Sequence, residues 1–143
     1  MIIEQQDDIF RAVRQARVIA VVGISEDQER PSYMIAQRII AYNRFKVYLV
    51  NPIHAGKKIL GHEVIGSLLN VSEPIDIVNV FRRPNAIEPI LEDAVRCDAR
   101  LVWLQPGTEN LEVIEKYQDK IDIVFNACLG VMAAGALATA GTA

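Results

Sequence analysis

Residues 18–32 read VIAVVGISEDQERPS, and this stretch decides the fold. The unbroken apolar run from Val18 to Val22 has the length and the β-branched content of a strand buried on both faces. Gly23 ends the run, and a helical pattern follows Ser32, which we expect to cap that helix. Strand, glycine loop and helix in this order favour anion binding, because free backbone N–H groups and the positive end of the helix dipole face the loop.

The alternation of apolar runs with helical patterns continues along the chain. Further strands are predicted over Phe45 to Val50, Ile75 to Val80, Leu101 to Leu104 and Ile121 to Phe125. Helices are predicted over Ile3 to Arg14, over Ser32 to Tyr42, after a capping box of Asn85 and Glu88, and after a cap at Thr108. The pattern predicts an α/β fold: a single Rossmann-like, doubly wound, five-stranded parallel sheet with helices on both faces.

Composition sets the broad class of protein. The chain has 143 residues, 51% of them hydrophobic, which fits one domain spanning 1–143. Its core lies at about 17–128, and the uncharged Ala- and Gly-rich tail at 129–143 is a packed helix, a subunit contact or disordered. No apolar segment reaches the roughly 20 residues of a membrane span, and the N-terminus carries acids where a signal peptide carries basic charge. We expect a cytoplasmic monomer or weak homodimer with no membrane partner.

Cysteine and histidine usage gives no sign of a metal site. Cys97 and Cys128 lie far apart with no CxxC motif, so we expect two free thiols. His54 and His62 have no matching Asp, Ser or Cys arrangement, so no catalytic residue is assigned.

Charge is distributed unevenly. The net charge of -3 argues against a nucleic-acid partner. The segment 30–62 nevertheless lacks Asp and Glu and carries six basic residues: Arg30, Arg38, Arg44, Lys46, Lys57 and Lys58. A basic block beside a glycine loop suits a small polyanion, although solvated Lys and Arg that cluster by chance give the same pattern.

Each predicted strand ends in residues suited to ligand binding. In an open parallel sheet, ligands lie beyond the carboxyl ends of the strands, where the strand order reverses. The ends are Gly23-Ile24-Ser25, Asn51-Pro52, Phe81-Arg82-Arg83-Pro84, Gln105-Pro106-Gly107 and Asn126-Ala127-Cys128. One crevice would gather all five, although Gly, Pro and Asn also end strands as ordinary turn residues.

The loop composition narrows the choice of ligand. A dinucleotide site normally has a denser glycine pattern and an acid at the end of the second strand, where this chain has Asn51-Pro52. The GxxxxGK[ST] motif of nucleoside triphosphate sites is absent. NAD and ATP are therefore disfavoured. A small NAD(P)-dependent oxidoreductase, or another nucleotide-using enzyme, stays open as the alternative.

Taken together, the motifs resemble a known family. In order they are VVGIS, ERPS, VNP, GHEV, DIVNVFRRP, VWLQPG and NAC. This series resembles the small stand-alone CoA-binding proteins, which are similar to the N-terminal CoA-binding domain of the succinyl-CoA synthetase α subunit. The resemblance implies a domain that binds coenzyme A or an acyl-CoA through its phosphates, as a non-catalytic carrier, sensor or regulatory module. Leu49, Gln28 and Ala127 depart from the family pattern.

The resemblance also implies a set of ligand contacts. Gly23, Ile24 and Ser25 would face the pyrophosphate, helped by Arg30 and Ser32. The resemblance also places Asn51, Pro52 and Lys57 or Lys58 near the adenosine 3′-phosphate. The adenosine and phosphates would be flanked by Phe81, Arg82 and Arg83, and the pantetheine channel by Gln105 and Gly107. No metal is implied.

Overall fold

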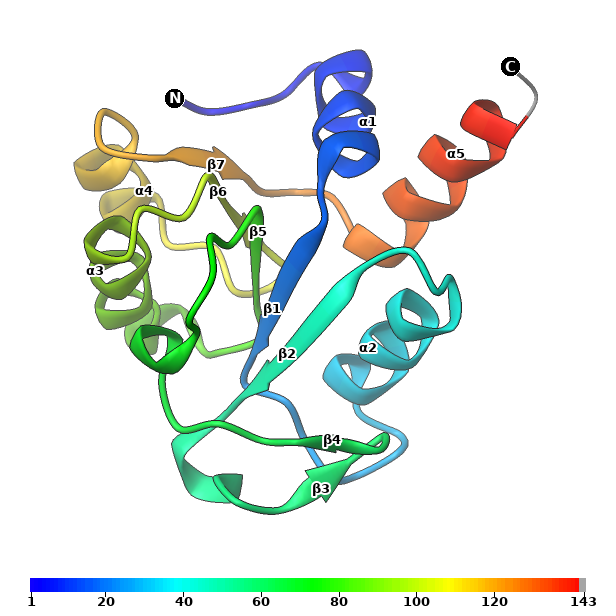
Figure 1. Ribbon diagram of the computed structural model, residues 1–143. Coiled ribbons are helices and arrows are strands. Elements are labelled where there is room, and N and C mark those ends of the chain that lie inside the picture. The colour runs from blue at the N-terminus through cyan, green and yellow to red at the C-terminus, as the bar shows by residue number, and fades with distance from the viewer. Residues whose placement is uncertain (142–143) are drawn as a thin grey trace.

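Five parallel strands form the central sheet (Figure 1), which confirms the predicted α/β fold. The computed structural model describes residues 1–141, with side chains up to residue 138. The strands are β1 (Val18–Val22), β2 (Lys46–Val50), β5 (Ile77–Val80), β6 (Leu101–Leu104) and β7 (Asp122–Val124). Their spatial order is β2-β1-β5-β6-β7, so the order reverses between β1 and β5.

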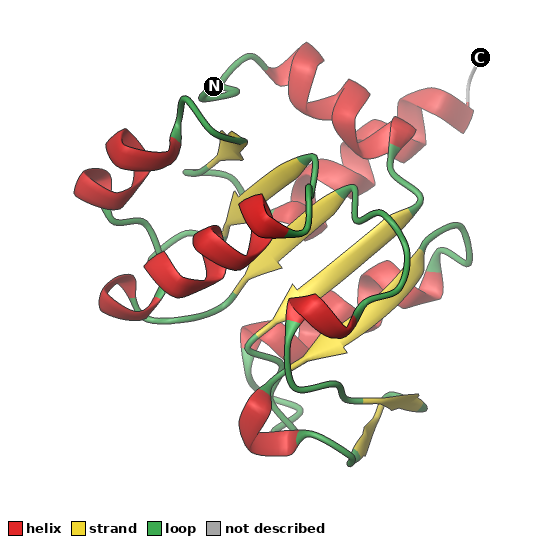
Figure 2. Cartoon of the chain, turned by 60° about the vertical axis from the view of Figure 1, so that its left-hand side comes forward, coloured by secondary structure: helices red, strands yellow, loops and turns green. Residues whose placement is uncertain are grey.

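Helices cover both faces of the sheet (Figure 2), as predicted. They are α1 (Gln6–Gln15), α2 (Pro31–Ala41), α3 (Glu88–Arg96), α4 (Leu111–Tyr117) and α5 (Leu129–Gly141). One core lies under α1, α2 and α5 and includes Ile19, Val21 and Trp103. The other lies under α3 and α4 and includes Ala20 and Val78. Because alternate residues of β1 enter opposite cores, the whole strand is buried, as its apolar run predicts.

The tail forms a packed helix, one of the three states expected from its composition. Leu129, Ala133 and Ala136 of α5 are buried against α1 and α2. Small residues allow this contact, since a Cβ added at Gly135 would lie 2.8 Å from the Phe10 ring. Within residues 1–141, none of the helices combines the length and the apolar character that crossing a bilayer requires.

Helix α2 begins before the predicted cap. The prediction of Ser32 as its cap is wrong, because the helix begins at Pro31. Arg30 occupies the N-cap position, and its side chain makes no hydrogen bond that caps the helix. The Ser32 hydroxyl instead accepts a hydrogen bond from the Ser25 amide at 3.0 Å, which ties the loop after β1 to the helix.

The other two predicted caps are also wrong. Asn85 lies in a short 3-10 turn (η3, Pro84–Ala86), and α3 begins only at Glu88 without a side-chain cap. The Thr108 hydroxyl donates back to the Gln105 carbonyl at 2.7 Å. Asn110 caps α4 instead, by accepting from the Val113 amide.

The segment between β2 and β5 holds short elements outside the predicted strands and helices. It contains two 3-10 turns, η1 (Pro52–His54) and η2 (Leu68–Asn70), and an antiparallel hairpin of β3 (Lys58–Ile59) and β4 (His62–Glu63). Before β5, the Asp76 carboxylate accepts from the amides of Arg17 and Val18 at 2.8 Å and 3.0 Å. This carboxylate therefore aligns β1 with β5, and strand pairing starts at Ile77.

Gly23 is the point where the ends of β1 and β5 touch. Its φ is +92°, and a Cβ there would lie 2.3 Å from the Phe81 carbonyl oxygen. Only glycine tolerates both the conformation and the contact. The two loops that follow these strands therefore meet at the reversal point of the sheet.

This contact generates a stability prediction. Gly23→Ala should lower the free energy of unfolding by about 2–4 kcal/mol, because it adds a steric clash to an unfavourable backbone conformation. Gly56→Ala is the matched control, because Gly56 has a φ of +89° and no atom within 4 Å of an added Cβ. In urea unfolding experiments, Gly56→Ala should lower the free energy of unfolding by only about 1 kcal/mol. Equal losses for the two variants would contradict the steric account.

Candidate functional site

A cleft of about 650 Å³ lies beyond the carboxyl ends of β1, β2, β5 and β6. Most of the residues predicted as ligand contacts line it: Gly23, Ile24, Ser25, Arg30, Ser32, Asn51, Phe81, Arg82, Arg83, Gln105 and Gly107. Its lining also includes residues that the sequence reasoning did not assign: Pro31, Ile53, His54, Pro84, Pro106 and Thr108. The topology thus brings four of the predicted strand ends into one site.

The predicted fifth strand end does not join this cleft. Asn126 and Ala127 line a separate pocket with Glu4, Ile9 and Met132. The reason is topological, because β7 is the edge strand farthest from β2 and its chain turns directly into α5. The expectation of one crevice for all five ends is therefore wrong for β7.

The loop between β1 and α2 forms one corner of the cleft. Besides the Ser25–Ser32 bond, the Ser25 hydroxyl accepts from the Asp27 amide at 3.0 Å, and Asp27 accepts from the Glu29 amide at 3.0 Å. These bonds order the loop from within. Since α2 has no side-chain cap, the amides of Ser32 and Tyr33 have no partner among the described residues and could donate to an anion, with the helix dipole behind them.

Three arginines surround this corner. Arg82 and Arg83 follow β5, and neither forms an ion pair with any residue that the structure describes. The Arg30 guanidinium lies 3.9 Å from Asp27, and its side chain is 71% exposed. A phosphate could bind these cations without first breaking a strong internal ion pair.

Asn51 lines the cleft, but its side chain is used inside the protein. Its amide nitrogen donates to the Ile24 carbonyl at 2.8 Å, and its amide oxygen accepts from the Ile53 backbone at 3.0 Å. It therefore joins the loop after β1 to the turn after β2. Ile24 is also fully buried, and its carbonyl is the group that Asn51 binds.

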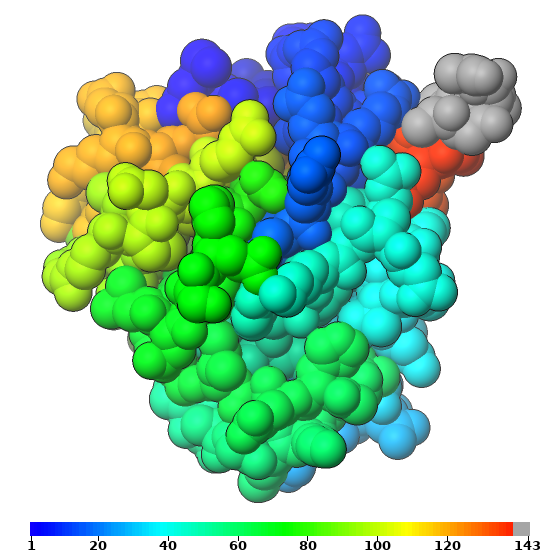
Figure 3. All heavy atoms as spheres, in the orientation of Figure 1, coloured from blue at the N-terminus to red at the C-terminus, as the bar shows by residue number. Residues whose placement is uncertain are grey.

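Pro52, Lys57 and Lys58 lie outside the lining of the cleft, contrary to the placement implied by the resemblance. Pro52 starts η1 and lines an adjoining pocket with Gly23 and Arg82. Both lysines belong to the hairpin segment, which projects at the lower end of the molecule (Figure 3). The Lys57 ammonium lies 3.5 Å from both Glu26 and His54, so it reaches only the rim.

The acid-free segment 30–62 does not form one basic surface. Lys46 pairs with Glu73 at the outer edge of β2, where hydrogen bonds from Lys46 and Tyr48 hold the pKa of Glu73 below its ordinary value. Arg44 donates to the Arg14 carbonyl. Of the six basic residues, only Arg30 lines the cleft, and the remaining cations of the site come from Arg82 and Arg83.

The β6 end of the cleft is uncharged and tightly hydrogen-bonded. Gln105 is 6% exposed, and its side-chain oxygen accepts from the Asn79 side chain at 3.2 Å and from the Leu129 amide at 2.9 Å. Trp103 lies in the core below, and its indole N–H donates to the Ala127 carbonyl at 2.8 Å. Both cysteines are free, as expected, and burial raises the pKa of the Cys97 thiol.

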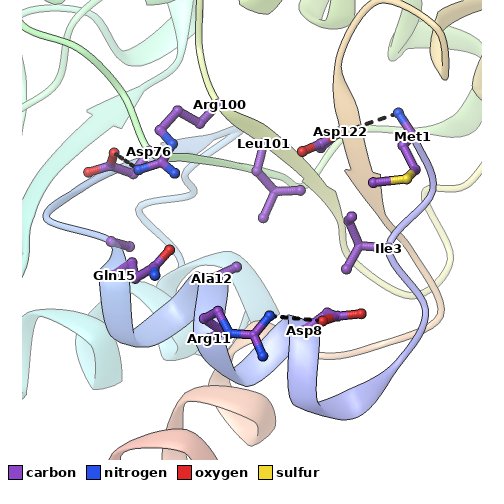
Figure 4. A pocket seen from close by; sticks show the side chains of 11 residues that line it. Met1, Ile3, Asp8, Arg11, Ala12, Gln15, Asp76, Arg100, Leu101 and Asp122 are labelled. Carbon is purple, nitrogen blue, oxygen red and sulfur yellow. Dashed lines mark hydrogen bonds and ion pairs between the residues drawn. The ribbon is translucent and has the colours of Figure 1, made fainter.

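A second pocket, of about 310 Å³, lies at the opposite end of the sheet (Figure 4). Its charged groups are already paired with one another. Asp8 contacts Arg11 at 3.1 Å, Asp76 contacts Arg100 at 3.8 Å, and Asp122 contacts the Met1 amino group at 3.3 Å. This pairing leaves the carboxyl-end cleft as the stronger candidate for an anionic ligand.

The geometry of the cleft suits a ligand with a charged end and a neutral polar end. Backbone amides and arginines gather near β1 and β5, whereas amide, hydroxyl and main-chain groups line the β6 end. Within the described residues, no three His, Cys, Asp or Glu side chains gather as metal ligands would.

Comparison with known proteins agrees with this geometry. The family model of the CoA binding domain matches residues 17–134. The uncharacterized protein YneT of Bacillus subtilis (strain 168) is 30% identical over 125 residues, which cover 87% of this chain and 90% of that protein.

Two solved structures are similar over nearly their whole length. Cell-free ID.343 from Thermus thermophilus has 31% identity and a TM-score of 0.85, with 93% of this chain and 99% of that chain covered. A hypothetical protein from Pyrococcus horikoshii OT3 has 27% identity and a TM-score of 0.87, with 94% and 93% covered. Because the family model spans most of the sequence and includes every strand of the sheet, the chain belongs to the CoA binding domain family.

Proposed function

We propose that this protein binds coenzyme A or an acyl-CoA in the carboxyl-end cleft, and that it acts as a non-catalytic carrier, sensor or regulatory module. One observation carries the proposal. An uncapped helix N-terminus and three arginines converge on one cleft in a member of the CoA binding domain family. Together they supply the amide and guanidinium donors that phosphates bind most strongly.

The ligand orientation follows from the distribution of charge. The pyrophosphate belongs at the start of α2, beside Ser25, Arg30 and Ser32, where donors are concentrated. The adenosine end then extends toward β2, where Ile53 offers an apolar side chain that is 74% exposed. His54 and Lys57 lie at this rim and supply donors for the 3′-phosphate. The pantetheine arm extends over the uncharged β6 end.

An NAD(P)-dependent oxidoreductase is the competing function. β2 is followed by Asn51, whose amide is already bound to Ile24 and Ile53, rather than by an acid that would hold the ribose of NAD. The loop after β1 has a single glycine, whereas both NAD and NADP sites normally have a denser glycine pattern. In a thermal-shift panel, we therefore expect CoA and acetyl-CoA to stabilise the protein more than NAD, NADP or ATP. A larger shift with NADP, together with hydride transfer, would replace the CoA proposal with the oxidoreductase.

Loss of the arginines should abolish CoA binding. At about one hundred times its Kd, CoA should raise the melting temperature by roughly 5–10 °C. The double variant Arg82→Ala/Arg83→Ala should lose this shift, because it removes two cations of the cleft that have no ion-pair partner among the residues that the structure describes. Arg11→Ala/Arg96→Ala is the matched control, since it removes the same charge from exposed positions outside the cleft. An unshifted wild type, or equal loss in the control, would refute the proposal.

Ionic strength gives a second test of the phosphate contacts. The Kd for CoA, measured by isothermal titration calorimetry, should rise as NaCl is increased, because salt screens attraction between exposed cations and phosphates. The Arg82→Ala single variant should bind CoA more weakly and with a shallower dependence of Kd on salt. A Kd independent of salt would show that the arginines do not bind the phosphates.

A further inference from the structure

Asn79 lies in the middle of a core strand, where a polar side chain is costly. It is fully buried on β5, with Val21 of β1 and Trp103 of β6 as its strand neighbours. Its amide nitrogen donates to Gln105, whereas its amide oxygen has no hydrogen-bond partner among the residues that the structure describes. A buried unpaired acceptor lowers stability, and an apolar residue of similar size would avoid that cost. The position therefore points to a role other than stability.

The bond from Asn79, together with one from the Leu129 amide, fixes the orientation of the Gln105 amide. The Gln105 oxygen accepts from two donors, the Asn79 side chain and the first amide of α5 at Leu129. If the amide were reversed, its NH₂ group would face both donors, which is unfavourable. The Gln105 nitrogen is therefore held in one place, where it contacts only the Cys128 sulfur, at 3.6 Å. Sulfur is a weak acceptor, and one amide N–H has no partner within the described residues.

The residue that carries this donor belongs to the uncharged wall of the cleft. Gln105 is a lining residue, and Pro106, Gly107 and Thr108 continue the same wall without a charge. The phosphate-binding groups lie toward β1 and β5. A ligand anchored there by its phosphates would bring its neutral arm to Gln105.

We propose that Gln105 donates its free amide N–H to a carbonyl oxygen of the ligand's neutral arm, and that Asn79 is the positioning residue that fixes this donor. The inference rests on the proposed function. Two kinds of carbonyl have the required chemistry. The amide carbonyls of the pantetheine arm are present in CoA and acyl-CoA alike, and the thioester carbonyl is present only in an acyl-CoA. Gln105 selects ligands that carry such an arm over ligands that carry the phosphates alone.

Gln105→Glu tests the donor, because it keeps an oxygen for Asn79 and Leu129 but replaces the NH₂ group with an acceptor. Calorimetry with CoA, acetyl-CoA and adenosine 3′,5′-bisphosphate, which has phosphates but no arm, separates the possibilities. We expect roughly tenfold weaker binding of both CoA and acetyl-CoA if an arm amide is the acceptor. If the thioester is the acceptor, only acetyl-CoA binding should weaken. The bisphosphate should bind as to the wild type in either case.

The outcomes separate this inference from the proposed function. Unchanged affinity for all three probes, or equal loss for all three, would overturn the role of Gln105 while leaving CoA binding intact. A wild type that binds none of the probes would overturn the proposed function and this inference with it. Should Gln105→Glu unfold, Gln105→Met removes the donor without adding a charge and is judged by the same three affinities.

Asn79→Leu tests the positioning role. The unliganded variant should melt at or above the wild-type temperature, because a buried unpaired oxygen is removed. It should nevertheless weaken binding of the same arm-bearing probes as Gln105→Glu, and the double variant should lose no more than Gln105→Glu alone. Additive losses, or wild-type affinity in Asn79→Leu, would overturn the positioning role. Asn79→Val serves as the second variant if the leucine does not fit.

Discussion

The contact between Gly23 and the Phe81 carbonyl is the constraint on which the site depends. It occurs where the strand order reverses, and its closeness excludes any side chain at position 23. Because the ends of β1 and β5 meet there, the uncapped start of α2 and the arginines after β5 face the same cleft. A looser junction would separate the amide donors from the cationic side chains and leave two weak anion sites in place of one.

The polar residues of the cleft divide into two groups. Asn51, Ser32 and the oxygen of Gln105 bind other parts of the chain, and these bonds hold the strand-end loops in position. Among the described residues, the guanidinium groups of Arg82 and Arg83 and the amides of Ser32 and Tyr33 have no hydrogen-bond partner, so they remain available to a ligand. A cleft whose walls are fixed before the ligand arrives loses little conformational entropy on binding. The hydrogen bonds from its donors to the ligand therefore contribute more to affinity. The family match and this division of roles support the same ligand class.

The sequence predicted the sheet well because its strands are apolar runs with clear ends. The bounds of β1 agree with the prediction, since Gly23 must break the pattern for the reason above. The predicted helix caps at Ser32 and Thr108 were wrong because both hydroxyls form hydrogen bonds with loop atoms. A single sequence does not show which of several possible partners a hydroxyl binds. Most of the lining was predicted because parallel strands place their ends together. Lys57 and Lys58 were placed at the ligand from the resemblance alone, and the segment of the β3–β4 hairpin holds them outside the lining of the cleft. Ile53 and His54 were missed, although a proline opening a turn after β2 was a usable signal.

An NMR titration with CoA tests the central claim, that the ligand binds at the carboxyl ends of the strands, most directly. In ¹H–¹⁵N spectra, the account predicts saturable shifts of the backbone amides of Ser25, Ser32 and Arg82, which line the cleft. The amides of Asp8, Arg11 and Arg100, around the paired charges at the opposite end, should stay unchanged. Shifts confined to that opposite end, or no shift at the first turn of α2, would contradict the account.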